Sequence, residues 1–389
     1  MDNNISKVLG LEDVIVKNVE ENNDYLIIDI ELPRKLHCCP CCHNKTDRIH
    51  DYRFQMVKDL PAFGKQVFLR LRKRRYVCPD CGKRFDEINT FLPKYYHLTR
   101  RKIACIIDEF RKLKSASMIA KENDVSTTTA LRYLDVLSYG ALKLPQVLSI
   151  DEFKGNADGE KYQTILTDPQ HKKTIDVLPN RFEKDLVHYF MGFKNRENVK
   201  VFITDMNPHF KRVAEHCFPN AVIVADRFHV VRQVVWAMEN VRKAEQKRLS
   251  AHFRRYFKRS KSLLNKPMNK LNNEEKEKLA LMLSISPKLA TAYRLKNEFL
   301  NIIHMKSSDK ARPTLSKWML DAENSALHEF DSCITAYRNW YNEILNAIDY
   351  KWNNGFTEGC NNKTKVLKRV CFGIRNFNRF RNRILHCSA

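Results

Sequence analysis

Three acidic side chains have the setting that a metal-dependent phosphoryl-transfer site requires. Asp151 and Asp205 each stand at the end of an apolar stretch, VLSIDEF and KVFITDM, and Glu358 is the only acid among nine Lys or Arg from residue 351 onward. A carboxylate in a buried strand is costly unless it is paired or binds a cation. Oxygen ligands of this kind hold the two divalent ions that such chemistry uses. We therefore predict that Asp151, Asp205 and Glu358 are catalytic and bind Mg2+ or Mn2+.

A turn-capping role is the alternative for an aspartate at a strand end. That role suits Asp168 and Asp176, which also close apolar runs. It remains open for Asp205, because Asn207-Pro208 follows it.

Two cysteine pairs have the spacing of a zinc site. HCCPCCH at 37–43 and CPDC at 78–81 each contain a C-P-x-C turn, and two such turns complete a tetrahedral Zn2+ site. The matching registers predict the ligands Cys39, Cys42, Cys78 and Cys81. The crowded first pair leaves another register open, Cys38 with Cys41, and it leaves His37 and His43 as further candidate ligands.

The two aspartates need a sheet to hold them together, and the segment after Leu144-Pro145 predicts one. The pattern of strands and helices runs through 147–153, 161–168, 172–179, 182–193, 200–206, 210–218 and 221–229. Three strands followed by helix, strand, helix and strand is the order of an RNase H-like α/β core. Right-handed crossovers would make the last two strands parallel to the first, so the aspartates would meet beyond the carboxyl ends of the strands.

A helix from Thr357 onward is expected to carry the third acid. Its predicted apolar stripe comprises Phe356, Cys360, Leu367 and Cys371. Another face carries Glu358, Asn362, Lys365 and Arg369. If that face looks toward the strand ends, Glu358 meets the metal ions while Lys365 and Arg369 bind phosphates.

Two N-terminal segments predict DNA contacts. The arm RLRKRRY would contact phosphates through Arg70, Arg72 and Arg74, although it has the pattern of a solvated strand face as well. Residues 115–137 have the pattern of a helix-turn-helix, a pattern that ordinary helical hairpins share. Its second helix, capped by Ser126, would present Thr127, Thr128 and Arg132 to a major groove.

Composition narrows the classes of partner. The 389 residues carry a net charge of +24, which favours a polyanion, nucleic acid above all, and 43% hydrophobic residues suffice for packed cores. No apolar run is long enough for a membrane span, and the N-terminus lacks the features of a signal peptide. We therefore expect a cytoplasmic protein that binds double-stranded DNA and keeps its cysteines reduced or metal-bound.

The predicted fold class is multidomain α/β, with an RNase H-like core, an all-helical insertion, a zinc-ribbon-like β domain and a helix-turn-helix domain. The predicted segments are a zinc-binding domain at 1–90, a helix-turn-helix domain at 96–140, the first part of the core at 146–236, the insertion at 237–345 and the last core helix at 346–389.

Four motifs in order resemble the ISL3 family of bacterial insertion-sequence transposases. They are IDEF (150–153), ITDMNPHF (203–210), ADRFHVVR (225–232) and NNGFTEGCNNKTKVLKR (353–369). The resemblance covers essentially the whole chain and implies a DDE transposase with Asp151, Asp205 and Glu358 as its triad. It also implies that Asp226 and His229, similar to a [C/D]-x-x-H signature, help to order the site or contact DNA.

The resemblance implies a sequence of activities. The N-terminal domains would recognise the inverted repeats of the element, and the core would cleave there and join the 3′ ends to target DNA. Two ends must meet in one complex, so a homo-oligomer on DNA is expected. The alternatives are a zinc and helix-turn-helix DNA-binding regulator without catalysis, and an RNase H-like nuclease without strand transfer.

Overall fold

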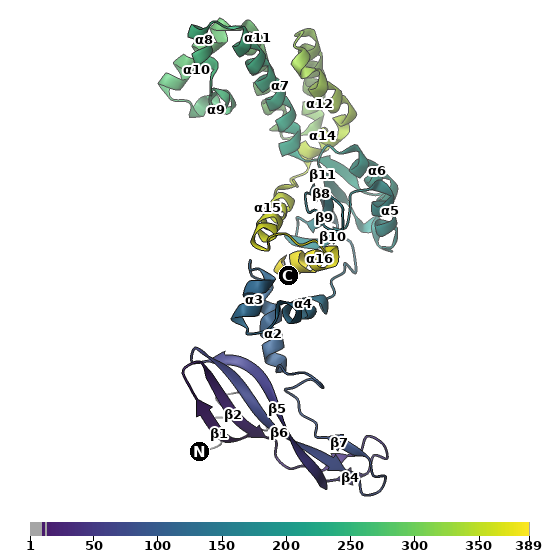
Figure 1. Cartoon of the computed structure of the whole chain (residues 1–389). Coiled ribbons are helices and arrows are strands. Elements are labelled where there is room, and N and C mark those ends of the chain that lie inside the picture. The colour runs from purple at the N-terminus through teal and green to yellow at the C-terminus, as the bar shows by residue number, and fades with distance from the viewer. Residues whose placement is uncertain (1–9, 12–13, 389) are drawn as a thin grey trace. The chain divides into compact units, whose positions relative to one another are not determined.

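The computed structural model describes residues 10, 11 and 14–388, and the chain divides into two compact units. The first comprises Met1–Ser138 with Val370–Phe372, and the second comprises Tyr139–Arg369 with Gly373–Ala389. Figure 1 labels their elements. None of the helices in the described ranges combines the length and apolarity that crossing a bilayer demands.

The sheet of the first unit is built around one long hairpin. Its strands are β1 (Ile15–Glu21), β2 (Tyr25–Glu31), β5 (Ile49–Ala62), β6 (Lys65–Val77) and β7 (Arg84–Asp86). They run in the order β1-β2-β6-β5, with β7 on β6, and β3 (His37–Cys38) pairs with β4 (Lys45–Thr46). The side of β6 that is buried changes along its length: Leu69 and Leu71 are buried first, and then Arg74 and Tyr76. Strand β6 of the β5–β6 hairpin therefore buries one face at its start and the other face at its end.

Helices α2 (Arg100–Glu109), α3 (Ala116–Glu122) and α4 (Thr127–Asp135) complete the first unit. Each begins at a hydroxyl cap, because Thr99, Ser115 and Ser126 accept N–H bonds from the third residue beyond them. Asp124, at a φ of 51°, forms the turn between α3 and α4. Lys58 of β5 binds the carboxylate of Asp124 at 2.6 Å, which ties this turn to the sheet.

The sheet of the second unit follows the predicted element order. It contains β8 (Val147–Phe153), β9 (Gln163–Asp168), β10 (Lys173–Leu178), β11 (Val201–Thr204) and β12 (Val222–Ala225). The strand order is β10-β9-β8-β11-β12. Strands β8, β9 and β10 pair antiparallel, whereas β11 is parallel to both β8 and β12. The crossovers therefore set the last two strands parallel to the first, as predicted.

Helices cover both faces of this sheet (Figure 1). On one face α5 (Glu183–Met191) and α6 (Pro208–Cys217) pack on Leu148, Ile150 and Phe202. On the other face α14 (Tyr341–Asp349) packs on Val147, Val201 and Ile203, and α15 (Gly355–Val370) and α16 (Phe377–Ser388) follow it. Side chains alternate along a strand, so Asp151 shares the α14 and α15 face with Val147.

A helical region separates β12 from the last helices of the sheet. It contains α7 (Arg227–Arg248), α8 (Ala251–Phe257), α9 (Lys261–Asn265), α10 (Asn273–Ile285), α11 (Pro287–Ile303), α12 (Ser308–Asn324) and α13 (Asp331–Asn339). The region also has short 3₁₀ turns, η2 (Met268–Lys270) and η3 (His328–Phe330), whereas η1 (Arg196–Asn198) precedes β11. In the core of this helical region the ring centroids of Phe299, Trp318 and Tyr337 lie within 5.7 Å of one another.

Candidate active site and metal centre

The carboxyl ends of β8 and β11 bring two acids together. The strands are parallel, with Ser149 opposite Ile203. Asp151 and Asp205 each lie two residues further on, so they lie side by side on one face of the sheet. Asp205 directly follows the last residue of β11, and Asp151 lies two residues before the end of β8. The structure thus juxtaposes the two aspartates that the sequence singled out.

Both aspartates are held in a setting that opposes ionisation. Burial, together with the charge of Asp205, raises the pKa of Asp151 to about 7. Burial also raises the pKa of Asp205, although the nearby His229 offsets part of this effect. Like charges at one partly buried edge favour protonation or a bound cation. An oxygen-ligated divalent ion is the cation that such a pair suits.

Helix α15 carries Glu358 and is fixed to the sheet by a buried hydroxyl network. Thr357 Oγ1 lies 2.8 Å from Ser149 Oγ in β8 and 2.7 Å from Thr167 Oγ1 in β9. Ser149 also donates to Asn354, just before the helix. Because Thr357 immediately precedes Glu358, this network determines where Glu358 emerges beside the strands. The Glu358 side chain itself is exposed.

The packed face of α15 differs from the predicted apolar stripe. Its buried residues are Thr357, Asn361, Thr364 and Leu367. Of the predicted stripe only Leu367 is buried, and the other members are half-buried. The prediction failed because the sheet offers hydroxyl groups at this place, and polar partners on the helix satisfy them.

Asn361 is a site residue that sequence reasoning missed. Its Nδ2 donates to Asp151 Oδ2 at 2.9 Å, and its side chain is 4% exposed. Its Oδ1 is buried and has no hydrogen-bond partner among the residues that the structure describes. The sequence did offer one signal for Asn361. It lies three residues after Glu358, so on a helix the two side chains are neighbours.

Asp226 links three parts of the site. It caps α7, and its Oδ2 accepts a 2.8 Å bond from His229 Nδ1. Its Oδ1 accepts from the backbone N–H of Asn354, whose carbonyl in turn accepts from Glu358 N. The bond to Asp226 raises the pKa of His229, against the effect of burial, so a positive ring is favoured beside the acids. Asp226 thereby orients both His229 and the start of the Glu358 helix.

The oxygen atoms of the three predicted acids do not lie as close together as the ligand atoms of a preformed metal site. In the ranges that the structure describes, a single group of three or more candidate ligands has all its ligand atoms within 4.8 Å, and it contains none of these acids. Glu358 therefore lies on an element beside Asp151 and Asp205 without closing on both. We call Asp151, Asp205 and Glu358 the acid site.

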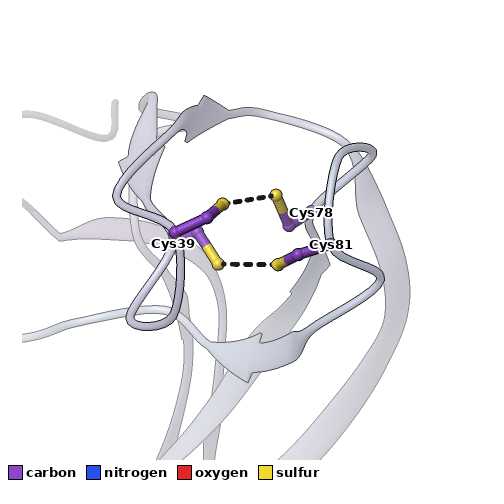
Figure 2. A group of neighbouring side chains, drawn as sticks. Cys39, Cys78 and Cys81 are labelled. Carbon is purple, nitrogen blue, oxygen red and sulfur yellow. Dashed lines mark hydrogen bonds between the residues drawn. The ribbon is translucent and has the colours of Figure 1, made fainter.

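That group is the cysteine cluster of the first unit, formed by Cys39, Cys42, Cys78 and Cys81. Figure 2 shows labelled members of the cluster with their sulfur atoms turned toward one another. The Sγ atoms of Cys39 and Cys81, and those of Cys42 and Cys78, are 3.5 Å apart. Although burial opposes it, N–H groups of Cys42 and Cys41 and neighbouring thiols lower the pKa of Cys39 to about 7. This four-thiol set fits Zn2+.

The two halves of the cluster repeat one backbone turn. His43 N donates to Cys39 O, and Gly82 N donates to Cys78 O, both at 3.0 Å. His43 and Gly82 each have a positive φ, 64° and 69°. This repeat explains the register with Cys39 and Cys42. The alternative register is wrong, since Cys38 and Cys41 are exposed and lie outside the cluster.

Comparisons with known proteins match both parts of the chain that hold these residues. A family model described as "Transposase" matches residues 148–384, more than half of the chain. A second, described as "zinc-finger of transposase IS204/IS1001/IS1096/IS1165", matches residues 35–81. The chain belongs to the ISL3 family of insertion-sequence transposases.

Relatives of this family member include two described transposases. The chain is 25% identical over 368 residues to the transposase for insertion sequence element IS1001 of Bordetella parapertussis, covering 92% of this chain and 90% of that protein. It is 22% identical over 241 residues to the transposase for IS1557 of Mycobacterium tuberculosis, covering 56% and 54%. A match of 32% identity to an "ATP-dependent protease" of Lactococcus lactis covers only 27% of this chain.

The basic arm of this ISL3 member is largely paired within the protein. Arg74 is 6% exposed and lies 3.4 Å from Glu87, and Arg70 bonds both Asp29 and Glu20. Arg72 is exposed, with its guanidinium 3.9 Å from the Tyr52 ring centroid. Arg72 also lies 3.5 Å from Glu31, and it is the most exposed of the three arginines.

Other predicted DNA-contacting residues are accessible. Thr127, Thr128 and Arg132 are all exposed on α4. In the second unit Lys365 and Arg369 are exposed on α15, on the side away from its buried face. Both groups of side chains are accessible from solvent.

Proposed function

We propose that this ISL3 member is a DDE transposase that binds the inverted-repeat ends of an insertion sequence, cleaves DNA and joins the 3′ ends to target DNA. The observation that carries the proposal is the adjacency of Asp151 and Asp205, with the helix bearing Glu358 bonded to the same strands. Carboxylates from sheet and helix meeting at one edge are the arrangement that phosphoryl transfer requires.

The topology supports an RNase H-like core. The order β10-β9-β8-β11-β12, with an antiparallel and a parallel half, is the one expected of that fold. In this proposal 146–236 and 346–389 form the core, and 237–345 is its insertion. The zinc-binding segment 1–90 and the helix-turn-helix segment 96–140 recognise DNA, with α4 entering a major groove.

The residues at the strand ends fit Mg2+ or Mn2+. All the candidate ligand atoms are oxygens, and the two aspartates resist ionisation together. Asn361 Oδ1 is buried and has no partner in the described ranges. Bound divalent ions would supply positive charge to the attacking and leaving oxygens of the scissile phosphate. Asp151 and Asp205 would hold them from the sheet, and Glu358 would hold them from α15.

The remaining residues orient the acids and the DNA. Asp226 holds the His229 ring through Nδ1, which turns Nε2 and its positive charge outward from that carboxylate. Lys365 and Arg369 neutralise phosphates on the exposed side of the Glu358 helix. DNA binding should therefore weaken steeply as salt concentration rises.

The decisive experiment separates cleavage from binding. Asp205→Asn and Glu358→Gln should each abolish Mg2+-dependent cleavage of a duplex carrying the inverted repeat that flanks the gene, while retaining binding to it. Asp168→Asn is the matched control, because Asp168 also ends a strand but caps its own turn through the N–H groups of Gln170 and His171. Cleavage by either acid-site variant would contradict the proposal.

The alternatives predict different products. A regulator would bind the duplex without cutting it, and a nuclease would cut without joining. Incubation of the wild-type protein with pre-cleaved end DNA and a supercoiled target should yield joined products only for a transposase. The joined species should contain two ends, so native mass measurement of the end complex should show a homo-oligomer.

A further inference from the structure

An exposed stripe of aromatic and cationic side chains runs along α7. Phe228, Arg232 and Trp236 occur at every fourth position and so share one helix face. Phe228 is 56% exposed and Trp236 is 51% exposed. The Arg232 guanidinium lies 6.0 Å from the Phe228 ring centroid and 5.0 Å from the Trp236 ring centroid. We call these three residues the α7 stripe.

Folding does not explain the α7 stripe. The core contacts of α7 come from its opposite face, where Val230, Val234 and Met238 are fully buried in the helical insertion. Large aromatic side chains left exposed next to a cation are characteristic of binding surfaces. The stripe therefore indicates a partner.

The Nε–H group of Arg232 lacks a hydrogen-bond acceptor within the described part of the chain. This Nε is buried, and a buried N–H left unpaired is costly. Phosphate oxygens are among the strongest acceptors for a guanidinium. The chain's net charge of +24 also favours an anionic partner. These observations favour a nucleic acid over an apolar protein surface.

The α7 stripe begins at the edge of the acid site. The Phe228 ring packs edge-on against the ring of His229, with centroids 5.5 Å apart. The charge of Arg232 lowers the pKa of His229, and the charge of Asp205 raises it. From Phe228 to Trp236 the helix rises roughly 12 Å. That length matches a few nucleotides at about 3.4 Å each.

We propose that the α7 stripe binds unpaired nucleotides of the DNA strand next to the scissile phosphate. The bases stack on Phe228 and Trp236, and a phosphate oxygen accepts from the Arg232 guanidinium. Stacking tolerates any base. Such tolerance suits the DNA outside a mobile element, which differs at every insertion site. This inference rests on the proposed function and identifies the part of the substrate that α7 holds.

The test compares two duplexes that carry the inverted repeat. One is fully paired, and the other is mismatched at the nucleotides flanking the cleavage position. Trp236→Ala and Phe228→Ala should each slow cleavage of the paired duplex about tenfold. The mismatched duplex should recover much of the lost rate, because its bases are already unstacked. Trp236→Phe keeps a stacking face and should cleave nearly as well as the wild type.

A second readout does not depend on activity. In the Glu358→Gln protein, 5-iodouracil at the flanking position should crosslink on irradiation to a peptide within Arg227–Arg248. Phe253→Ala is the matched control, because Phe253 is 41% exposed on α8, the helix after α7, and lies outside the stripe. It should leave both the cleavage rate and the crosslink unchanged.

The outcomes separate the two proposals. Unchanged cleavage of the paired duplex by Trp236→Ala, or an equal loss in Phe253→Ala, would overturn the role of the α7 stripe and leave the transposase proposal standing. A change in oligomeric state of DNA-free Trp236→Ala would assign the stripe to a second copy of the chain instead, and would also overturn it. If wild type and Glu358→Gln fail alike to cleave both duplexes, the proposed function itself fails.

Discussion

The cysteine cluster and the acid site hold their ligands in opposite ways. In the cluster all four sulfur atoms lie within 4.8 Å of one another, presented by two copies of the same turn. In the acid site Asp151 and Asp205 are adjacent, but Glu358 stands on a separate helix and is exposed. Thiols can approach one another as neutral groups, whereas carboxylates repel, so we expect the acid site to close only when positive charge enters it.

This difference matches two kinds of task. A structural zinc site is closed by four protein ligands, and its metal contributes directly to folding. The acid site, in the function we propose, has to leave room for a phosphate between its acids. The sheet and the α15 hydroxyl network therefore fix the positions of the acids without bringing them into contact. Three variants probe the contrast.

The largest effect is expected from the cysteine cluster. Cys78→Ser removes a buried ligand, so the protein should lose its Zn2+ and the folding energy it provides, about 10 kcal/mol in small zinc domains. The zinc content and the thermal unfolding of the first unit measure this loss. Cys41→Ser is the matched control, because Cys41 lies in the same run but is exposed and outside the cluster. Loss of zinc in Cys41→Ser would refute the register.

A substitution at the acid site should have a smaller effect, and it should raise stability instead of lowering it. The pKa of Asp151 rises from its ordinary value of 3.8 to about 7 on folding. Between these values the unfolded chain has released a proton that the folded chain keeps, so stability falls as pH rises. Above pH 7 the free energy of unfolding has lost the full contribution of this group, at most about 4 kcal/mol. Asp151→Asn should therefore raise the metal-free unfolding temperature at pH 8.

The pH series supplies its own control. At pH 4 the wild-type Asp151 is already protonated when folded, so Asp151→Asn should change the unfolding temperature little. Added Mg2+ should stabilise the wild type at pH 8 more than it stabilises the variant. Equal slopes of stability against pH in the two proteins would show that Asp151 does not carry this charge penalty.

The strand order and the cysteine register could be predicted because their signals are local. Apolar runs ending in Asp151 and Asp205 mark buried strands, and handedness then sets their directions. The C-P-x-C turn repeats within a few residues, so Cys39 and Cys42 follow from Cys78 and Cys81. Neither inference needed to know which distant elements touch.

The packing of α15 and of the basic arm could not be predicted because it depends on distant partners. The buried face of α15 is polar, since it meets Ser149 and Thr167 on strands far away in the sequence. Arg74 is buried because β6 changes its buried side and meets Glu87. Periodicity assigns side chains to faces, but it does not say which face a neighbour will cover.

The smallest effect separates Asn361 from its neighbour on α15. Asn361→Ala removes a 2.9 Å bond to Asp151, whereas the adjacent Asn362 is exposed. A hydrogen bond to a charged group contributes about 1.5–3 kcal/mol, so Mg2+-dependent cleavage should fall roughly 10- to 100-fold. Binding to end DNA should persist, and the stabilisation by Mg2+ should shrink. Asn362→Ala should match the wild type in all three measurements. If the two variants behave alike, Asn361 does not position Asp151, and the hydroxyl network alone couples α15 to the sheet.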